Sequence, residues 1–410
     1  MKLISSCAVL LSLTASALAA SNLTLLKEYS GSSFFDDWDF YGDSNVNYLG
    51  EPWNGTTPWD DFTSGDVFYM GRSNGSKLYT VESNGHAYIT VDNTSFVAPG
   101  QKRPSIRLTS KDWYNYGTVW VIDVYHLPWG CSVWPSIWTS GSVWPQDGEI
   151  DIIEGVNRMT YNRMALHTTS GCSAANGTDQ DGTPGTPDCS QAAGCTVDEN
   201  KPNSYGPDFN SNSGGVWGAQ FDVSGIYIWF WPRTEIPPSI STSNGSIDLI
   251  DWGTPSAAYP SSSCNITNYF GWQQLIIDIT LCGQWAGQDS IYDQTCNNTA
   301  QIPANSPSSR CTTDNVFNNG TADYAMAYFE IGSIKAFAAN TTAISSTTPS
   351  SLVPGATASN TGGSSPASTS SSLPSGSNTQ GSTGGGPLVV SDQLQKFAML
   401  FAVLTWLLLL

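Results

Sequence analysis

Three acidic residues lie within one short, otherwise apolar segment, Glu149-Ile150-Asp151-Ile152-Ile153-Glu154. Side chains alternate between the two faces of an extended strand, so Glu149 and Asp151 share a face. Strict alternation would place Ile153, not Glu154, beside them. A β-bulge with Ile153 as the extra residue returns Glu154 to the acidic face, and bulges often occur next to active sites.

Clustered carboxyl groups suit acid–base chemistry, because like charges at close range keep one group protonated and raise its pKa. Glycoside hydrolysis uses one ionised and one protonated carboxyl group, about 5–5.5 Å apart in retaining enzymes. Glutamate reaches farther than aspartate, so we assign the chemistry to Glu149 and Glu154 and hydrogen bonding between them to Asp151. The spacing does not decide which glutamate attacks. An edge strand with ordinary acids and a calcium site are the alternatives.

Aromatic residues precede the acids, and tryptophan rings stack well on sugars. Trp134, Trp138 and Trp144 are therefore candidate substrate-binding residues, with core packing as the alternative for each. Trp144, which is nearest to the acids, is the candidate for the subsite of the cleaved sugar. His167 is expected on the neighbouring strand, where it would hydrogen-bond a sugar hydroxyl or the acid/base. Trp272 and Trp285 flank Cys282 and could line a distal subsite, but we leave them unassigned.

The elements that must position these residues are short strands. Each candidate is rich in β-branched or aromatic residues and is bounded by turn residues, which favours an antiparallel β-sandwich. Trp229 and Trp231 alternate with apolar residues, so we assign them to the core. The candidate strands are Val67–Met70, Ala87–Val91, Ser105–Thr109, Thr118–Val124, Ile150–Ile153, Gln220–Trp231, Tyr269–Ile279 and Tyr324–Phe337.

The composition of the whole chain indicates what kind of polymer it meets. The 410 residues include 16 Trp, and the formal net charge is −19. That charge repels nucleic acid, so we expect no nucleic-acid partner. A neutral polysaccharide is compatible with both the charge and the aromatic content.

Several features predict export. Residues 1–19 resemble a signal peptide, with Lys2 before an apolar run and Ala17-Leu18-Ala19 as the cleavage site. Of the nine cysteines, Cys7 lies in the signal peptide, and the other eight predict up to four disulfides. The sequence does not indicate which cysteines pair. A zinc site is disfavoured by the lack of a CxxC pair. Ten glycosylation sequons start at Asn22, Asn54, Asn74, Asn93, Asn176, Asn244, Asn265, Asn297, Asn319 and Asn340.

The C-terminal part changes character. Residues 340–386 are mostly Ser, Thr, Gly, Pro and Ala, which predicts a disordered, O-glycosylated stalk. Residues 387–410 form a spacer and an apolar end, the pattern of a removed glycosylphosphatidylinositol (GPI) signal. A short transmembrane helix is the alternative. The small residues at the expected lipid attachment site are Ser382, Gly384, Gly385 and Gly386.

The acidic segment resembles the bulged signature of glycoside hydrolase family 16. Residues 126–138, His-Leu-Pro-Trp-Gly-Cys-Ser-Val-Trp-Pro-Ser-Ile-Trp, and Leu166-His167-Thr168 are similar to its fungal laminarinase branch. The resemblance implies an all-β, concanavalin A-like jelly-roll sandwich over residues 22–338, with a concave glucan cleft. It also implies retaining endo-hydrolysis, with Glu149 as nucleophile, Glu154 as acid/base, and Asp151 orienting and tuning Glu149.

Together these features predict a single-domain, monomeric endo-1,3(4)-β-glucanase, tethered to the outer face of the plasma membrane or cell wall by a GPI lipid. Its partners would be β-glucan and the membrane. No cofactor and no catalytic metal are expected, and a structural calcium stays open. A wall-remodelling transglycosylase is the first alternative, which the bulge disfavours, and a non-catalytic glucan-binding wall protein is the second. The sequence leaves the preference between β-1,3 and mixed linkages open.

Overall fold

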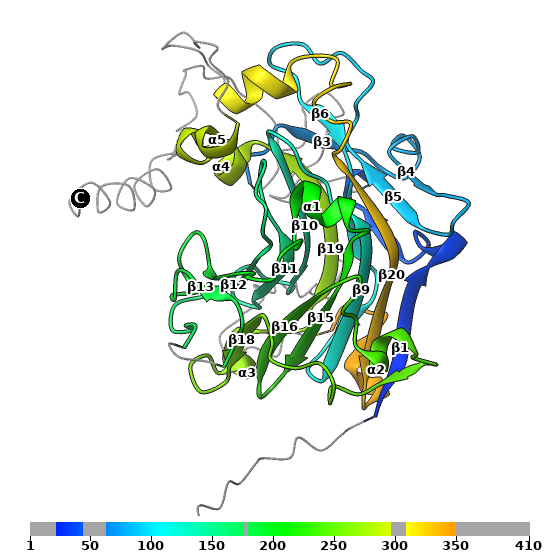
Figure 1. Cartoon of the computed structure of the whole chain (residues 1–410), viewed down its shortest axis with the longest axis vertical. Coiled ribbons are helices and arrows are strands. Elements are labelled where there is room, and N and C mark those ends of the chain that lie inside the picture. Colours follow the sequence, from blue (N-terminus) through cyan, green and yellow to red (C-terminus); the bar gives the residue numbers. More distant parts are fainter. Residues whose placement is uncertain (1–21, 44–62, 176–178, 297–308, 350–410) are drawn as a thin grey trace, which may run out of the picture. The chain divides into compact units, whose positions relative to one another are not determined.

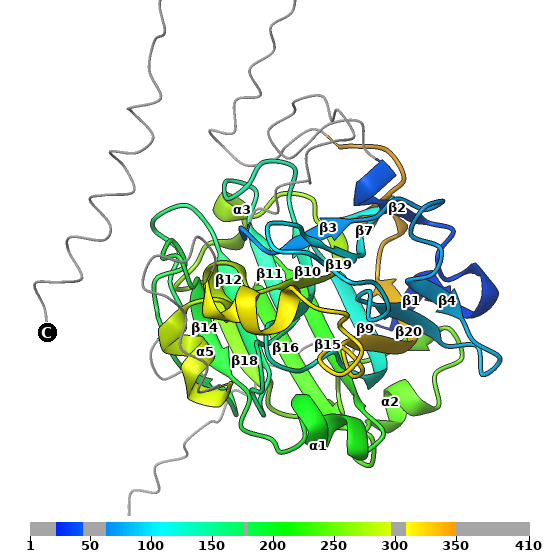
Figure 2. The ribbon, with the colours of Figure 1, turned by 90° about the horizontal axis from the view of Figure 1, so that it is seen from above.

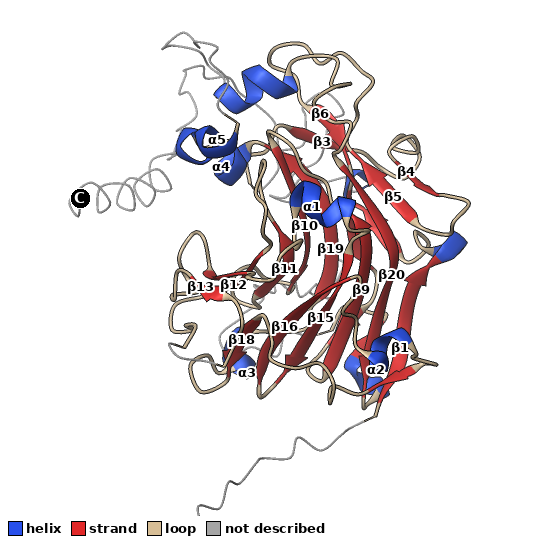
Figure 3. Cartoon of the chain, viewed as in Figure 1, coloured by secondary structure: helices blue, strands red, loops and turns tan. Residues whose placement is uncertain are grey.

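Two antiparallel sheets account for most of the chain in the computed structural model, which describes residues 22–43, 63–175, 179–296 and 309–349. Figures 1 and 3 show the strands of both sheets curving alongside one another. All described residues belong to one compact unit, Met1–Thr357, and a second unit, Ala358–Leu410, lies outside them. Within the described part, no helix has the length and apolar character needed to cross a membrane.

The first sheet is built around the long strands β20 and β9. Along the start of β20, Phe329 and Ile331 are buried while Tyr328 and Glu330 are partly exposed, the period-two pattern of a strand with one covered face. In spatial order the sheet contains β17 (Ser246–Ile247), β1 (Leu23–Ser30), β20 (Tyr328–Ala338), β9 (Thr118–His126), β15 (Gly215–Asp222), β16 (Gly225–Pro232) and β18 (Ala257–Pro260), with β5 (Ala87–Thr90) pairing with β20 and β4 (Tyr79–Val81) pairing with β5.

The second sheet carries the acidic segment in its middle. In order it contains β13 (Thr183–Pro184), β14 (Cys195–Asp198), β12 (Arg163–His167), β11 (Glu149–Glu154), β10 (Val133–Ser140), β19 (Gln274–Leu281), β7 (Arg107–Ser110) and β2 (Trp38–Phe40). Figure 2 shows β12, β11, β10 and β19 in one layer and β18, β16, β15 and β9 in the other. These two layers form the predicted jelly-roll sandwich, which is confirmed.

The remaining elements are short. Two further strand pairs are β3 (Val67–Tyr69) with β6 (Arg103–Ser105), which is parallel, and β8 (Trp113–Tyr114) with β21 (Ile344–Ser345). The α-helices are α1 (Gly206–Ser211), α2 (Pro238–Ser241), α3 (Ile266–Tyr269), α4 (Gly283–Ala286) and α5 (Asp289–Thr295), and single helical turns are η1 (Gly31–Ser33), η2 (Tyr41–Asp43), η3 (Thr312–Val316) and η4 (Thr341–Ala343).

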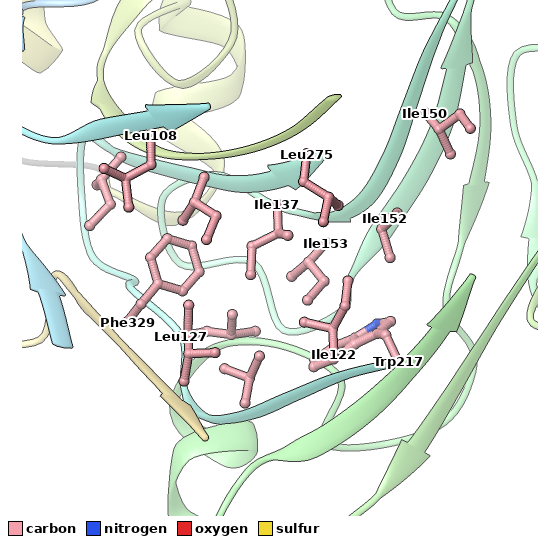
Figure 4. Close-up of a cluster of buried hydrophobic side chains, with 14 of the residues drawn as sticks. Leu108, Ile122, Leu127, Ile137, Ile150, Ile152, Ile153, Trp217, Leu275 and Phe329 are labelled. Carbon is pink, nitrogen blue, oxygen red and sulfur yellow. The ribbon is translucent and has the colours of Figure 1, made fainter. Parts of the chain in front are cut away.

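Apolar side chains from both sheets form the main core. Figure 4 shows Ile137 and Ile150 of the second sheet and Ile122 and Trp217 of the first sheet, which are all buried. A second cluster includes Trp229 and Trp231, at 6% and 5% exposure, so their predicted assignment to the core is confirmed.

Four predicted strands need correction. Tyr324–Phe337 begins too early, because residues 321–326 form turns and β20 starts at Tyr328, and Ser105–Thr109 spans the end of β6 and most of β7. Gln220–Trp231 is not one strand but a hairpin, because β15 ends at Asp222 and β16 begins at Gly225. The turn is fixed by Asp222, whose carboxylate accepts a hydrogen bond from the amide of Ser224 at 2.9 Å. Tyr269–Ile279 begins too early, because Tyr269 ends α3 and β19 starts at Gln274.

The eight cysteines form four disulfides, which confirms the predicted number. The pairs are Cys131–Cys296, Cys172–Cys264, Cys189–Cys195 and Cys282–Cys311.

Seven of the ten sequon asparagines are described, and six of these seven are exposed, with Asn93 half-buried. Their accessibility permits glycosylation, which stays a prediction. The signal peptide, Asn54, Asn176, Asn297, the stalk beyond residue 349 and the lipid attachment region lie outside the described residues. The predicted start of the disordered stalk at residue 340 is wrong, because residues 341–345 form η4 and β21, β21 pairs with β8, and Ala343 is buried.

Candidate active site

The acidic segment is strand β11, which pairs with β10 on one side and β12 on the other. Across β10, Ile137 faces Ile153 and Trp138 faces Asp151, so Ile152 has no residue opposite it. Two residues against one is the arrangement of a β-bulge. The predicted bulge is therefore present, but its extra residue is Ile152 rather than Ile153.

The bulge brings the two glutamates to the same side of the sheet. Ile152 and Ile153 are 0% and 1% exposed and both pack in the core, whereas Glu149 and Glu154 are partly exposed and line one groove. Figure 4 shows both isoleucines among the core side chains. Because both isoleucines are apolar and buried, the sequence pattern does not distinguish which of them lacks a residue opposite it in β10.

Asn162 supplies the hydrogen bonds that the bulge removes from the ladder. Its side-chain amide donates to the carbonyl oxygen of Ile152 at 2.9 Å, and its side-chain oxygen accepts from the backbone N–H of Glu154 at 2.9 Å. Asn162 is fully buried. Buried backbone groups need partners, so this one side chain stabilises the irregular backbone that presents Glu154.

The groove beside β11 has a volume of about 380 Å³ and contains all three acids. Aromatic, charged and small polar side chains from both neighbouring strands and from α4 form its walls. The lining residues are Thr63, Arg107, Trp134, Ser136, Trp138, Ser140, Trp144, Glu149, Asp151, Glu154, Arg163, His167, Ala192, Ala193, Asp278, Thr280, Gln284, Trp285 and Gln288.

Glu149 begins β11 and is reached through a tight turn. Gly148 has φ +76°, and a Cβ at this position would stand 2.2 Å from the ring of Phe270, so both the backbone conformation and the space require glycine. The indole N–H of Trp144 donates a hydrogen bond to the carboxylate of Glu149. Trp144 is 58% exposed, so the ring lies beside the acid with much of its surface open to solvent.

Glu154 ends β11 in a more enclosed position. The indole N–H of Trp134 donates to its Oε1 at 2.7 Å. Burial raises the pKa of Glu154 to about 7, against the opposing effects of Trp134 and His167 and with the added charges of Glu149 and Asp278. A carboxyl group with this pKa retains a proton over a large part of the neutral range, as a general acid must.

Asp151 lies between the two glutamates and pairs with His167, at 3.3 Å from Oδ2 to Nε2. Burial raises the pKa of Asp151 well above its usual value, and the charges of Glu149 and Glu154 act in the same direction. Burial alone would lower the pKa of His167, but Glu149, Asp151 and Glu154 together raise it to about 10. A cation at His167 therefore offsets the charge of the acidic cluster.

His167 sits directly across the ladder from Glu149, so its predicted position on the neighbouring strand is confirmed. The loop closed by Cys189–Cys195 packs against its ring. Gly194 has φ +68°, and a Cβ there would stand 2.9 Å from Nε2 of His167. Glycine at this position allows the loop to approach closely and hold the imidazole beside the acids.

Asp278 is a further carboxylate in the groove, on β19. It accepts hydrogen bonds from the indole N–H of Trp138 at 2.7 Å, from the hydroxyl of Ser136 at 3.2 Å and from that of Tyr69 at 3.1 Å. Asp278 is only 6% exposed, so these bonds fix the orientation of Trp138. The guanidinium of Arg107 lies 5.2 Å from the centre of the Trp138 ring.

A cation could be held here by Glu149, Asp151 and His167, whose ligand atoms all lie within 4.8 Å of one another. Binding would require His167 to lose its proton, and its raised pKa opposes that loss at neutral pH. The chemistry of these three donors is thus better matched to proton transfer, and we assign no metal.

A second cavity of about 360 Å³ shares Gln284 with the groove and is also lined by Asp66, Lys102 and Thr312 among others. Asp66 accepts a hydrogen bond from Thr312 at 2.5 Å. Asp66 is the one carboxylate among the described residues that line this cavity. The cavity therefore lacks the pair of carboxyl groups that glycoside hydrolysis uses.

All four substrate-binding candidates from the sequence, Trp134, Trp138, Trp144 and His167, line the same groove as the acids. Their contacts here are with the acids, and their roles toward substrate stay predictions. Sequence reasoning missed four other polar residues of the site, which carry no local motif. Arg107 and Asp278 come from β7 and β19, far from the acidic segment in sequence, whereas Asn162 and Arg163 lie just before and at the start of β12.

Comparisons with a family model, with curated relatives and with solved structures all match this chain to glycoside hydrolase family 16. The family model described as the XgeA-like, catalytic GH16 domain matches residues 53–337. A probable endo-1,3(4)-β-glucanase of Aspergillus fumigatus is 36% identical over 340 residues, which are 80% of this chain and 48% of that protein. The chain thus spans about half the length of the curated relatives it matches.

Two solved structures are similar over most of the described chain. One is laminarinase 16A from Phanerochaete chrysosporium with β-glucans in donor and acceptor sites, with a TM-score of 0.67 and 31% identity. The other is an elongating family 16 β-1,3-glucosyltransferase, with a TM-score of 0.66 and 34% identity. Each match covers 77% of this chain and 99% of the other.

Proposed function

Because the chain belongs to the XgeA-like group of glycoside hydrolase family 16, we propose that it is a retaining endo-hydrolase of β-1,3- and mixed β-1,3/1,4-glucans. The site at β11 supports this function through one observation above all. A bulge turns Glu149 and Glu154 into the same groove, with Glu154 poised to hold a proton near neutral pH.

In the first step, the Glu149 carboxylate attacks the anomeric carbon of the bound sugar and forms a glycosyl ester. Glu154 donates its proton to the departing glycosidic oxygen, so the leaving chain departs as an alcohol. Trp134 supports this step, because its hydrogen bond at 2.7 Å holds the Glu154 carboxyl group in place.

In the second step, Glu154 is ionised and accepts a proton from water, whose oxygen attacks the anomeric carbon and breaks the ester to Glu149. Two inversions give net retention. Asp151 and His167 contribute by setting the charge around Glu149. Nε2 of His167 lies 3.3 Å from Oδ2 of Asp151, and both side chains line the same groove as Glu149.

The two roles can be separated by chemical rescue. Glu149→Ala and Glu154→Ala should each lose nearly all activity on laminarin, by about three or more orders of magnitude, as expected for removal of a group that acts directly on the reacting bond. With an activated aryl β-laminaribioside and azide, Glu154→Ala should regain turnover and yield the β-glycosyl azide. Glu149→Ala should instead yield the α-azide.

Circular dichroism and thermal unfolding would verify that both variants are folded. Wild-type activity in either variant, or the opposite pair of azide anomers, would overturn the assignment.

For the substrate, we propose glucans with β-1,3 linkages as the common requirement, by analogy with the named relatives. Product analysis on laminarin, lichenan and barley glucan, side by side, tests this proposal. Release of oligosaccharides from laminarin and from at least one mixed-linkage glucan is expected. Failure to release oligosaccharides from laminarin, or from both mixed-linkage glucans, would contradict it.

Transglycosylation is the second candidate function, because the elongating β-1,3-glucosyltransferase is as similar in fold and sequence as the laminarinase. The two functions share the glycosyl-enzyme and differ in what attacks it. Net formation of reducing ends indicates hydrolysis, whereas longer chains at a constant number of ends indicate transfer.

We also propose that the protein is exported and GPI-anchored at the cell surface. Support comes from the signal-like residues 1–19, the composition of residues 350–386, which are mostly Ser, Thr, Gly, Pro and Ala, and the small-residue, spacer and apolar pattern that ends at residue 410. Phosphatidylinositol-specific phospholipase C should release the mature protein from intact cells. Retention of the C-terminal residues 387–410 in the mature protein would contradict the proposal.

A further inference from the structure

The turn between β10 and β11, residues 141–148, contains a buried carboxylate. Asp147 is 1% exposed, although Ser142, Val143 and Trp144 of the same turn are exposed. A carboxylate loses favourable hydration when it is buried, so it persists inside a protein where other groups satisfy it. The hydrogen-bond partners of Asp147 therefore indicate what this residue does.

The side chain of Asp147 closes the turn around Trp144. Its Oδ2 accepts a hydrogen bond from the hydroxyl of Ser142 at 2.6 Å and another from the backbone N–H of Val143 at 3.1 Å. The backbone N–H of Asp147 donates to the carbonyl oxygen of Val143 at 2.8 Å. At Gly141 a Cβ would stand 2.2 Å from Cβ of Asp147, so this close approach requires glycine. Bonds to the residues just before Trp144 thus fix the backbone that carries its ring.

The same residue attaches the turn to the second sheet. The carbonyl oxygen of Asp147 accepts a hydrogen bond from the backbone N–H of Gly271 at 2.9 Å and one from the side-chain amide of Gln273 at 2.7 Å. Gln273 is fully buried just before β19, and its side-chain oxygen accepts from the hydroxyl of Thr139 on β10 at 2.8 Å. The turn is therefore anchored both to β10 and to the residues that enter β19.

Trp144 depends on this support because much of its surface is in solvent. Its indole N–H donates a hydrogen bond to the carboxylate of Glu149, and the residue is 58% exposed. Core packing does not hold an exposed side chain, and keeping such a side chain in one rotamer costs conformational entropy. The direction of the indole, and with it the orientation of the Glu149 carboxylate, therefore depends on the backbone of the turn.

We propose that Asp147 is a positioning residue for the first step of the reaction. By fixing the turn, it keeps the indole N–H of Trp144 on one oxygen of Glu149, which holds the carboxylate in the orientation from which it attacks the anomeric carbon. The proposal rests on the proposed function, and Asp147 itself is not among the residues that line the groove. Reactions between groups held close together are sensitive to small displacements, so a loosened turn should slow attack more than it weakens binding.

The test measures the attack by Glu149 directly. A 2-deoxy-2-fluoro β-laminaribioside with a good leaving group should esterify Glu149 without help from a proton donor. The limiting rate constant of this inactivation, kinact, therefore reports the attack, and the half-saturating concentration, KI, reports binding. A purely structural defect lowers the amount of folded enzyme in a sample but leaves kinact of the folded molecules unchanged.

Three variants test the hydrogen bonds of the turn. Asp147→Ala should lower kinact by about tenfold and raise KI by less. Asp147→Asn keeps an oxygen that can accept from Ser142 and Val143, so its kinact should stay within about twofold of wild type. Ser142→Ala removes one of the two bonds to Oδ2 and should lower kinact by about threefold.

Asp92→Ala is the matched control. Asp92 is 5% exposed, and its Oδ1 accepts hydrogen bonds from the backbone N–H of Thr94 at 2.9 Å and of Ser95 at 3.1 Å. It is not among the residues that line the groove. Since both changes to alanine remove a buried carboxylate that holds a turn, thermal unfolding should show a loss of stability in each, while kinact falls in Asp147→Ala alone.

An unchanged kinact in Asp147→Ala, or an equal fall in Asp92→Ala, would overturn the proposal. Asp147→Asn as slow as Asp147→Ala would do so too, because charge rather than the turn would then govern the attack. If Asp147→Ala does not fold, the exposed residue Ser142 decides, since wild-type kinact in Ser142→Ala would overturn the proposal. A folded wild type that the reagent does not label at Glu149 would instead refute the proposed function, and the role of Asp147 with it.

Discussion

The pKa of Glu154 is raised and lowered by residues on four strands, β10, β11, β12 and β19. Burial raises its pKa first, the Trp134 hydrogen bond and the charge of His167 on β12 lower it, and the charges of Glu149 and Asp278 raise it again. The resulting value of about 7 predicts that kcat/KM falls as the pH rises through this region, because the acid must be protonated to donate. Removing one charged neighbour of Glu154 at a time should therefore shift the pH at which kcat/KM falls.

Removing the charge of Asp278 should move the alkaline limb to lower pH. Asp278→Asn keeps an oxygen to accept the hydrogen bonds of Trp138 and Ser136, so the geometry is retained while a negative charge near Glu154 is lost. We expect a downward shift of up to about one pH unit in the profile of kcat/KM. An unchanged limb would show that Asp278 does not act on Glu154.

Removing the cation at His167 should move the same limb in the opposite direction. His167→Gln deletes the positive charge that lowers the pKa of Glu154, so this pKa and the alkaline limb should rise. The pH profiles of the two variants, measured in the same buffers, provide mutual controls. Shifts in the same direction would contradict the electrostatic account.

At the scale of elements, the bulge in β11 depends on a residue outside the acidic segment. Asn162 makes two buried hydrogen bonds to the irregular backbone, at 2.9 Å each. Asn162→Ala should cost about 1–3 kcal/mol of stability and lower kcat more than it raises KM, because Glu154 loses its support.

Thermal unfolding and steady-state kinetics check the prediction for Asn162. Asn212→Ala is a matched control, because exposed Asn212 also donates a hydrogen bond, to Asp208 at 2.7 Å, at the end of α1. Equal loss of stability in both variants, with kcat unchanged, would show that Asn162 has no special role.

The acidic strand could be predicted because its three acids and its bulge lie within six consecutive residues. The rest of the site could not, because it is assembled by strand pairing. Asp278 reaches the groove because β19 pairs with β10, far away in sequence. Strand β10 itself was missed, since it contains Pro135, and proline argues against a central strand. Pairing with β11 starts only at Ser136, so no β11 partner needs an amide hydrogen from Pro135.

At the scale of the whole molecule, the sandwich and the number of disulfides followed from composition and the turn-bounded strands. The pairing of the cysteines did not, because eight cysteines permit 105 arrangements. The disulfides also differ in span, from 165 residues between Cys131 and Cys296 to 6 residues between Cys189 and Cys195. Longer closed loops restrict the unfolded chain more.

Removal of these two disulfides should therefore have unequal effects on stability. With the other crosslinks kept, the chain-entropy relation gives about 4 kcal/mol for Cys131→Ala/Cys296→Ala and about 2 kcal/mol for Cys189→Ala/Cys195→Ala. Denaturant unfolding of the two double variants measures the difference. A larger loss from the short loop would mean that its packing against His167, rather than chain entropy, dominates.

The most direct test of the account is to trap the covalent intermediate. A 2-deoxy-2-fluoro β-laminaribioside with a good leaving group should form a stable ester, and mass spectrometry of proteolytic peptides should locate it on Glu149. An adduct on Glu154 or Asp151, or complete turnover that inverts the anomeric configuration without any adduct, would contradict it.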